Sequence, residues 1–249
     1  MLLGMLCMAQ AKDRIVEHPP LLAQNSSSIE IDKIVMSDTV TTVYIKAFYR
    51  PKYWIKIATG SVLKDNNGIL YPIRKGIGIT LDKEFWMPES GEAEFQLTFP
   101  PIPQNVTRLD FSEGDFEGAY KIWGIQLDKK SFGKFKLPKD VIVPKADHKM
   151  TLPDPIVKYD KAILKGRILD YQKGMPDKGS LYYQDVIREG AQEGKIRIQD
   201  DGTFYHEMNV FMITPCTIMS PFGTIEYLLA PGETTSIVIN LRENARKQS

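Results

Sequence analysis

The sequence predicts an all-β protein that folds as two successive antiparallel β-sandwich domains. Three observations lead to this prediction. Apolar and polar residues alternate with a period of two along much of the chain, clusters of turn-forming residues separate the alternating runs, and before the final residues no window of about 12 residues shows a helical period. With 249 residues, of which 43% are hydrophobic and 25% charged, the chain is long enough to bury two cores.

The chain begins with a short apolar run, MLLGMLCMAQA, over residues 1–11. It ends in Ala9-Gln10-Ala11, a small-x-small pattern typical of signal-peptide cleavage, and it predicts export to the periplasm or cell envelope. The run has no basic segment before it, so either the true start lies upstream or the run is incidental. It is too short to span a bilayer, and Cys7 lacks the small residue expected before a lipidated cysteine.

Residues 12–147 are assigned to the first sandwich together with a linker. Strands are expected over 29–36, 41–50, 53–58, 77–81 and 93–99. In the last of these, Phe95, Leu97 and Phe99 alternate with polar neighbours, which indicates one buried face. Between about residue 128 and residue 160 four prolines occur among many lysines, a composition typical of an extended linker, so we place the boundary near residue 147.

Residues 148–249 are assigned to a second, smaller sandwich with a short polar tail. Strands are expected over 161–169, around Ile196 and Ile198, over 203–210, and on both sides of Pro231-Gly232. Asp200-Asp201-Gly202 is typical of a tight turn before one of these strands. The final residues, RENARKQS, begin to look helical.

The sequence contains no recognisable catalytic, cofactor or metal motif. A net charge of +1 gives no reason to expect nucleic acid or an anionic membrane as a partner. His18, His148 and His206 lie far apart in sequence and lack the spacing of metal ligands. Alternation places His206 on the apolar face of its strand. It is either a residue of the core or its edge, or the general base of a hydrolase whose site is built from loops. Cys216 has apolar and β-branched neighbours, which favours a small buried residue over a nucleophile.

An acidic stretch brings Asp110, Glu113, Asp115 and Glu117 close together in sequence. It lacks the rhythm of a known calcium loop, so an exposed acidic turn is favoured and no metal site is predicted. Whether two carboxylates lie at a distance suited to glycoside hydrolysis depends on the fold.

Aromatic residues gather in two stretches of the first domain, AFYRPKYW and EFWMP. Such rings either fill the core or, if exposed, stack on sugar rings, with Arg50 or Lys52 adding hydrogen bonds. We select Tyr53, Trp54 and Trp86 as the candidate ligand-binding residues.

Several segments resemble a known family. The runs IEIDKIVMSDTVTTVYIKAFYRPKYWIKI and ITLDKEFWMPESGEAEFQLTFPPIP are similar to the N-terminal region of exported, TlpA-type thioredoxin-like disulfide reductases of Bacteroidota. The segments LKGRILDY, IQDDGTF and LLAPGETTSIVINL resemble the small sandwich that precedes the thioredoxin domain there and, more distantly, carboxypeptidase-regulatory-like and immunoglobulin-like modules.

The resemblance implies a structural relative without the family's chemistry, because the chain has no Cys-x-x-Cys pair. We therefore expect a non-catalytic, exported binding or scaffold module without a cofactor, whose partner is a protein or a glycan of the cell envelope. The alternative is a carbohydrate-binding envelope protein that uses the exposed aromatics of the first domain.

Overall fold

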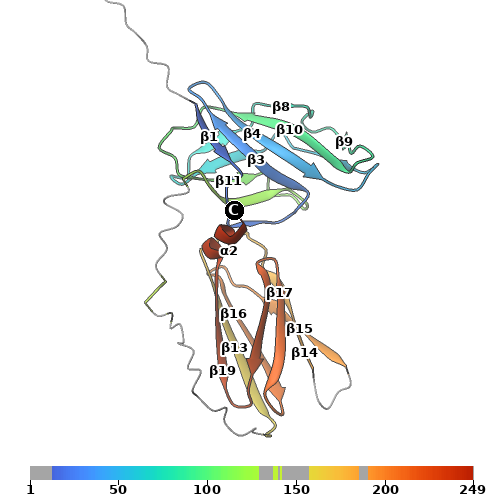
Figure 1. Cartoon of the computed structure of the whole chain (residues 1–249), viewed down its shortest axis with the longest axis vertical. Helices are drawn as coiled ribbons and strands as arrows, with labels where there is room; N and C mark the ends of the chain where they lie inside the picture. Colours follow the sequence, from blue (N-terminus) through green and yellow to red (C-terminus); the bar gives the residue numbers. More distant parts are fainter. Residues whose placement is uncertain (1–12, 129–136, 140, 142–156, 185–189, 249) are drawn as a thin grey trace, which may run out of the picture. The chain divides into compact units, whose positions relative to one another are not determined.

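The structure, a computed structural model, describes residues 13–128, 137–139, 141, 157–184 and 190–248. They fall into two compact units, one within residues 1–133 and the other within residues 134–247 (Figure 1). The regular secondary structure of both units is nearly all β-strand, which confirms the predicted all-β class. The predicted leader, the proposed boundary at residue 147 and His148 lie outside the described residues.

The first unit holds two five-stranded sheets and a separate two-stranded ribbon. In spatial order the first sheet consists of β1 (Arg14–Glu17), β3 (Ile29–Met36), β4 (Thr41–Phe48), β10 (Glu92–Phe99) and β8 (Lys75–Ile77). The second consists of β2 (Ala23–Gln24), β12 (Lys121–Gln126), β11 (Arg108–Ser112), β6 (Val62–Asp65) and β7 (Leu70–Pro72). The ribbon pairs β5 (Trp54–Ile55) with β9 (Phe85–Trp86).

The alternation of apolar and polar residues correctly predicts which residues form the core of the first unit. Phe95 and Leu97 on β10 are buried and stand opposite Ile45 and Val43 on β4. They belong to one apolar cluster with residues of the second sheet, such as Leu109 on β11. Each such side chain contributes about 1.5–3 kcal/mol by burial, so this shared core holds the two sheets together.

Two of the predicted strands are much shorter than expected. The segment 53–58 keeps strand pairing only at Trp54–Ile55, within the ribbon. The segment 77–81 is wrong as a strand, because β8 ends at Ile77. The next residue, Gly78, has a φ of 83°, a conformation that turns the chain and that residues with a Cβ rarely adopt.

The second unit holds a three-stranded and a four-stranded sheet. The first consists of β16 (Thr203–Val210), β13 (Asp160–Leu169) and β19 (Thr234–Asn240) in that order. The second consists of β15 (Ala191–Arg197), β14 (Lys178–Gln184), β17 (Thr214–Ser220) and β18 (Gly223–Leu229). The last two strands of the chain therefore belong to different sheets, and β19 runs parallel to β13.

The predicted inner face of β13 is confirmed, since Ala162, Leu164, Gly166 and Ile168 are all buried. Gly166 is required by its neighbour, because a Cβ there would lie 1.8 Å from the ring of Phe204 on the paired strand β16. The aromatic ring thus takes the space that a side chain would fill, and the glycine within the strand is a packing feature.

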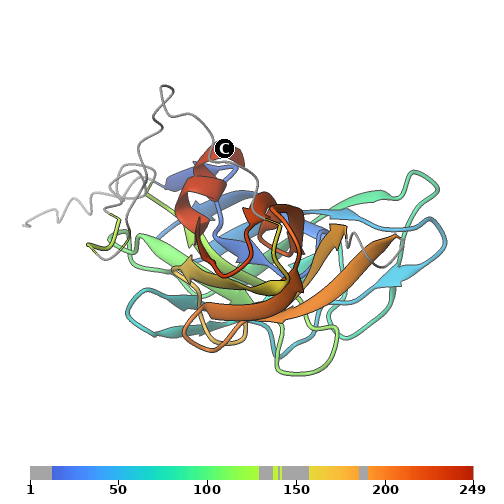
Figure 2. The same cartoon turned by 90° about the horizontal axis from the view of Figure 1, so that it is seen from below.

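The tail forms a helix, α2 (Leu241–Gln248), drawn in red in Figures 1 and 2. The side chain of Asn240 caps it by accepting hydrogen bonds from the backbone N–H groups of Arg242 and Glu243, at 3.1 and 3.3 Å. Arg242 donates two hydrogen bonds to the carboxylate of Asp170, at 2.8 and 3.0 Å, and so ties the helix to the end of β13.

In the part of the chain that the structure describes, no helix has the length and apolar character needed to cross a bilayer.

Candidate functional site

The ribbon of β5 and β9 presents two tryptophans on its outer side. Trp54 and Trp86 stand directly opposite each other across the ribbon, 43% and 59% exposed. On the inner side, Ile55 is buried and Phe85 packs against the core. The alternation of a strand explains both facts, because adjacent residues point to opposite faces and the inner pair anchors the ribbon.

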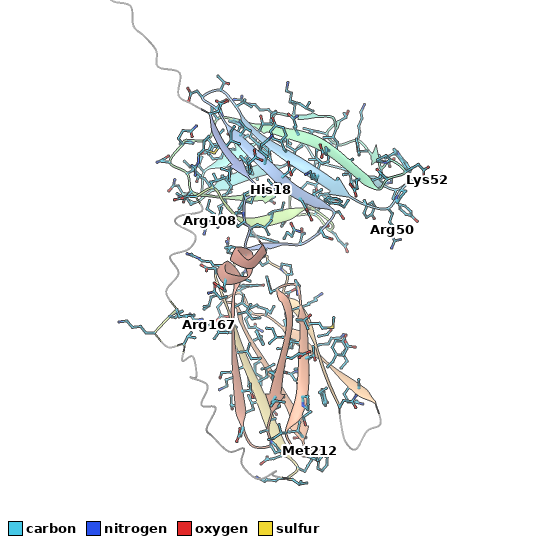
Figure 3. All side chains as sticks on the ribbon, in the orientation of Figure 1. His18, Arg50, Lys52, Arg108, Arg167 and Met212 are labelled. Carbon is cyan, nitrogen blue, oxygen red and sulfur yellow. The ribbon has the colours of Figure 1, made fainter. Side chains whose placement is uncertain are left out.

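Two tyrosines extend this aromatic surface. The rings of Tyr49 and Tyr53 meet edge to face with centroids 6.2 Å apart, and both are exposed. The guanidinium of Arg50 lies 5.8 Å from the centroid of the Tyr53 ring. Figure 3 places Arg50 and Lys52 at the end of the first unit where Figure 1 labels β9. The three predicted residues, Tyr53, Trp54 and Trp86, are thus exposed and close in the fold, while their role in ligand binding stays a prediction.

A cavity of about 570 Å³ lies beside Trp54. Three segments form it: residues 25–28 after β2, residues 49–56 around β5, and residues 113–120 between β11 and β12. Its aromatic lining comes from Tyr49, Trp54, Phe116 and Tyr120, and its charged lining from Lys56, Glu113 and Glu117. The predictions did not include Lys56, Phe116 or Tyr120, because no local pattern reveals that three distant segments meet.

Glu113 is a buried carboxylate that fixes the cavity wall. It accepts hydrogen bonds from the backbone N–H of Ala58 at 2.8 Å and of Tyr120 at 2.9 Å. Burial raises the pKa of Glu113, and the two backbone donors act in the opposite direction. Both carboxylate oxygens are therefore engaged in holding the loops on either side of the cavity.

The other residues of the acidic stretch point to separate partners. Asp110 accepts a hydrogen bond from the backbone N–H of Gly124 at 2.6 Å, and Asp115 pairs with Lys121 at 2.8 Å. Among the residues that the structure describes, no three His, Cys, Asp or Glu side chains come together as metal ligands. The stretch thus serves to shape the β11–β12 connection.

The two described histidines have different surroundings. His18 is exposed and lies 3.5 Å from Asp32. His206 on β16 is partly buried opposite Leu164, and burial lowers its pKa while a hydrogen bond with the backbone of Lys195 raises it. Within the described residues, His206 forms no ion pair with a carboxylate, and its surroundings are those of a residue at the edge of the core.

Cys216 on β17 is buried, as its neighbours predict, and stands opposite Tyr227 on β18. Burial raises the pKa of its thiol to about 11. At neutral pH the thiol is protonated, and a protonated thiol is a poor nucleophile. Cys216 is therefore a packing residue.

Comparisons with known proteins give only distant similarity. No family model matches the chain, and no curated protein sequence matches it. Among solved structures, type I pullulanase from Bacillus subtilis str. 168 complexed with maltose is similar at a TM-score of 0.27 and 7% identity, over 76% of this chain and 23% of that one. Pullulanase from Anoxybacillus sp. LM18-11 complexed with maltotriose has a TM-score of 0.26 and 12% identity, over 76% of this chain and 24% of that one. Pullulanase from Bacillus acidopullulyticus has a TM-score of 0.22 and 9% identity, over 84% of this chain and 34% of that one. The chain spans about a quarter to a third of the length of these proteins.

Proposed function

We propose that the chain is a non-catalytic binding module and that the aromatic surface of its first unit binds carbohydrate. The observation that supports this most is the cross-strand pair of Trp54 and Trp86, held outward by the buried inner side of the ribbon. Large rings exposed side by side are unusual unless they contact a ligand or partner, since burying them would stabilise the fold. Pyranose rings have an apolar face that stacks on indole, and the neighbouring cavity provides polar groups for the hydroxyls.

The test compares substitutions that separate binding from folding. We expect Trp54→Ala and Trp86→Ala each to weaken sugar binding about tenfold or more in affinity electrophoresis, because rigid aromatic anchors dominate binding energy. Both side chains are largely exposed, so the free energy of unfolding should fall by no more than about 1 kcal/mol.

Trp123 is the matched control, because it is only 8% exposed, on β12. Trp123→Phe should leave binding unchanged. If instead the two outer substitutions cost about 3 kcal/mol or more of stability, the rings belong to the core and the proposal loses its basis.

A second proposal is that the chain acts as an exported scaffold related to the N-terminal half of TlpA-type proteins. It is supported by the sequence resemblance and by Cys216, the only cysteine after residue 7, being buried with a pKa raised to about 11. The purified chain should then lack thiol-disulfide reductase activity and should be recovered from the periplasm or cell envelope. Reductase turnover that disappears in Cys216→Ser would contradict it.

A further inference from the structure

We infer that the cavity beside Trp54 selects sugars that carry a negative charge, a uronic acid carboxylate or an ester sulfate, through the ammonium of Lys56. This inference rests on the proposed carbohydrate binding and specifies its ligand. It begins from the position of Lys56, which follows β5 directly and lies two residues after Trp54. Both residues line the cavity together with Ile55, the buried residue between them.

Lys56 is a partly buried cation without an ion-pair partner. Among the described residues, no carboxylate oxygen lies within 4.0 Å of its ammonium. Two other lysines of the first unit differ in this respect: Lys52 pairs with Glu89 at 3.3 Å, and Lys121, whose side chain is 25% exposed, pairs with Asp115 at 2.8 Å. The carboxylates of Asp82 and Glu113 act on Lys56 only through longer-range attraction, so the donors of its ammonium stay available to an anionic ligand.

The two carboxylates of the cavity do not take this role. Glu113 already accepts a backbone N–H with each oxygen, and its charge acts on Lys56 from beyond hydrogen-bonding distance. Glu117 is exposed at the rim, where water screens its charge. Of the charged side chains that line the cavity, Lys56 is the cation, and within the described residues it forms no ion pair.

The chemistry of the remaining lining fits a substituted sugar ring. Tyr49, Trp54 and Phe116 provide apolar surfaces for the face of a pyranose, and a charged group on that ring would reach the ammonium. Lysine binds anions as a compact point charge and imposes no planar geometry, so carboxylate and sulfate are both accommodated. A neutral sugar would stack equally well on the rings but leave Lys56 without a partner.

The experiment measures affinity for matched oligosaccharides by titration calorimetry. Oligomers of glucose, galactose and mannose are each used in the neutral form, oxidised to the uronic acid and sulfated at the primary hydroxyl. We expect at least one charged form to bind the wild-type protein about tenfold more tightly than its neutral parent, with the preference shrinking as salt is added.

Three variants identify the group responsible. Lys56→Met keeps the aliphatic stem and should reduce binding of the charged form to the level of the neutral one, while neutral binding persists. Lys56→Arg should keep the preference, and Lys83→Met, which removes an exposed lysine outside the cavity lining, should change nothing.

The outcomes separate this inference from the proposed function. Equal affinity for charged and neutral forms, or a preference that survives in Lys56→Met, overturns the role of Lys56 and leaves sugar binding intact. No binding of any form overturns both. The charged form that binds more tightly, carboxylate or sulfate, identifies the anion that the site receives.

Discussion

Single buried polar residues hold the cavity in shape, and Glu113 is the most important of them. Its substitution to alanine would leave the partly buried N–H groups of Ala58 and Tyr120 without their acceptor. Each lost acceptor costs about 1–3 kcal/mol, so we expect the free energy of unfolding to fall by about 2–4 kcal/mol in urea denaturation. Asp115→Ala is the control, because its carboxylate is almost fully exposed, and a similar loss there would show that Glu113 has no special role.

His206 should make the stability of the protein depend on pH. Burial lowers its pKa in the folded state, so below about pH 6.5 the unfolded chain binds a proton that the folded chain resists. Stability is then complete above the unfolded pKa and falls as the pH drops towards the folded one. Thermal unfolding between about pH 7.5 and pH 5 should show this decline. His206→Gln should flatten the decline, and an unchanged slope in this variant would refute the assignment.

At the scale of elements, a cap at Asn240 and the ion pair between Arg242 and Asp170 help to hold the C-terminal helix. Asn240→Ala removes the acceptor for the N–H groups of Arg242 and Glu243 and should cost about 1 kcal/mol. Asp170→Asn replaces the carboxylate that accepts two hydrogen bonds from Arg242 with a neutral amide and should also lower helix stability. Hydrogen exchange of the amides in α2 measures both effects; protection unchanged in both variants would mean that packing of Leu241 and Ala245 alone holds the helix.

The ribbon shows where prediction from sequence succeeds and where it stops. Alternation within β10 and β13 identified buried residues such as Leu97 and Leu164, because one buried face imposes a period of two. The sequence left open whether Trp54 and Trp86 fill the core or lie exposed, and their cross-strand pairing, which joins segments 32 residues apart, depends on long-range register. The shortening of the predicted strand at 77–81 depends on Gly78, whose positive φ is a local exception to the alternation.

At the scale of the whole molecule, the tertiary fold creates what no local segment encodes. The cavity forms only because three connections of the first unit converge, and Lys56 lines it only in the folded protein. In the second unit, β18 and β19 follow each other in sequence yet enter different sheets, so that β19 runs parallel to β13. Chain connectivity alone favours pairing of successive strands, whereas β19 pairs with β13, far from it in sequence.

The most direct test of carbohydrate binding uses the tryptophans themselves as reporters. In Trp123→Phe the two remaining tryptophans are Trp54 and Trp86, so all indole emission comes from the proposed site. Titration of this variant with the neutral and charged oligosaccharides should give a saturable change in emission together with protection from a soluble quencher. If quencher access to both indoles stays the same at saturating concentrations of every sugar, the aromatic surface does not bind carbohydrate.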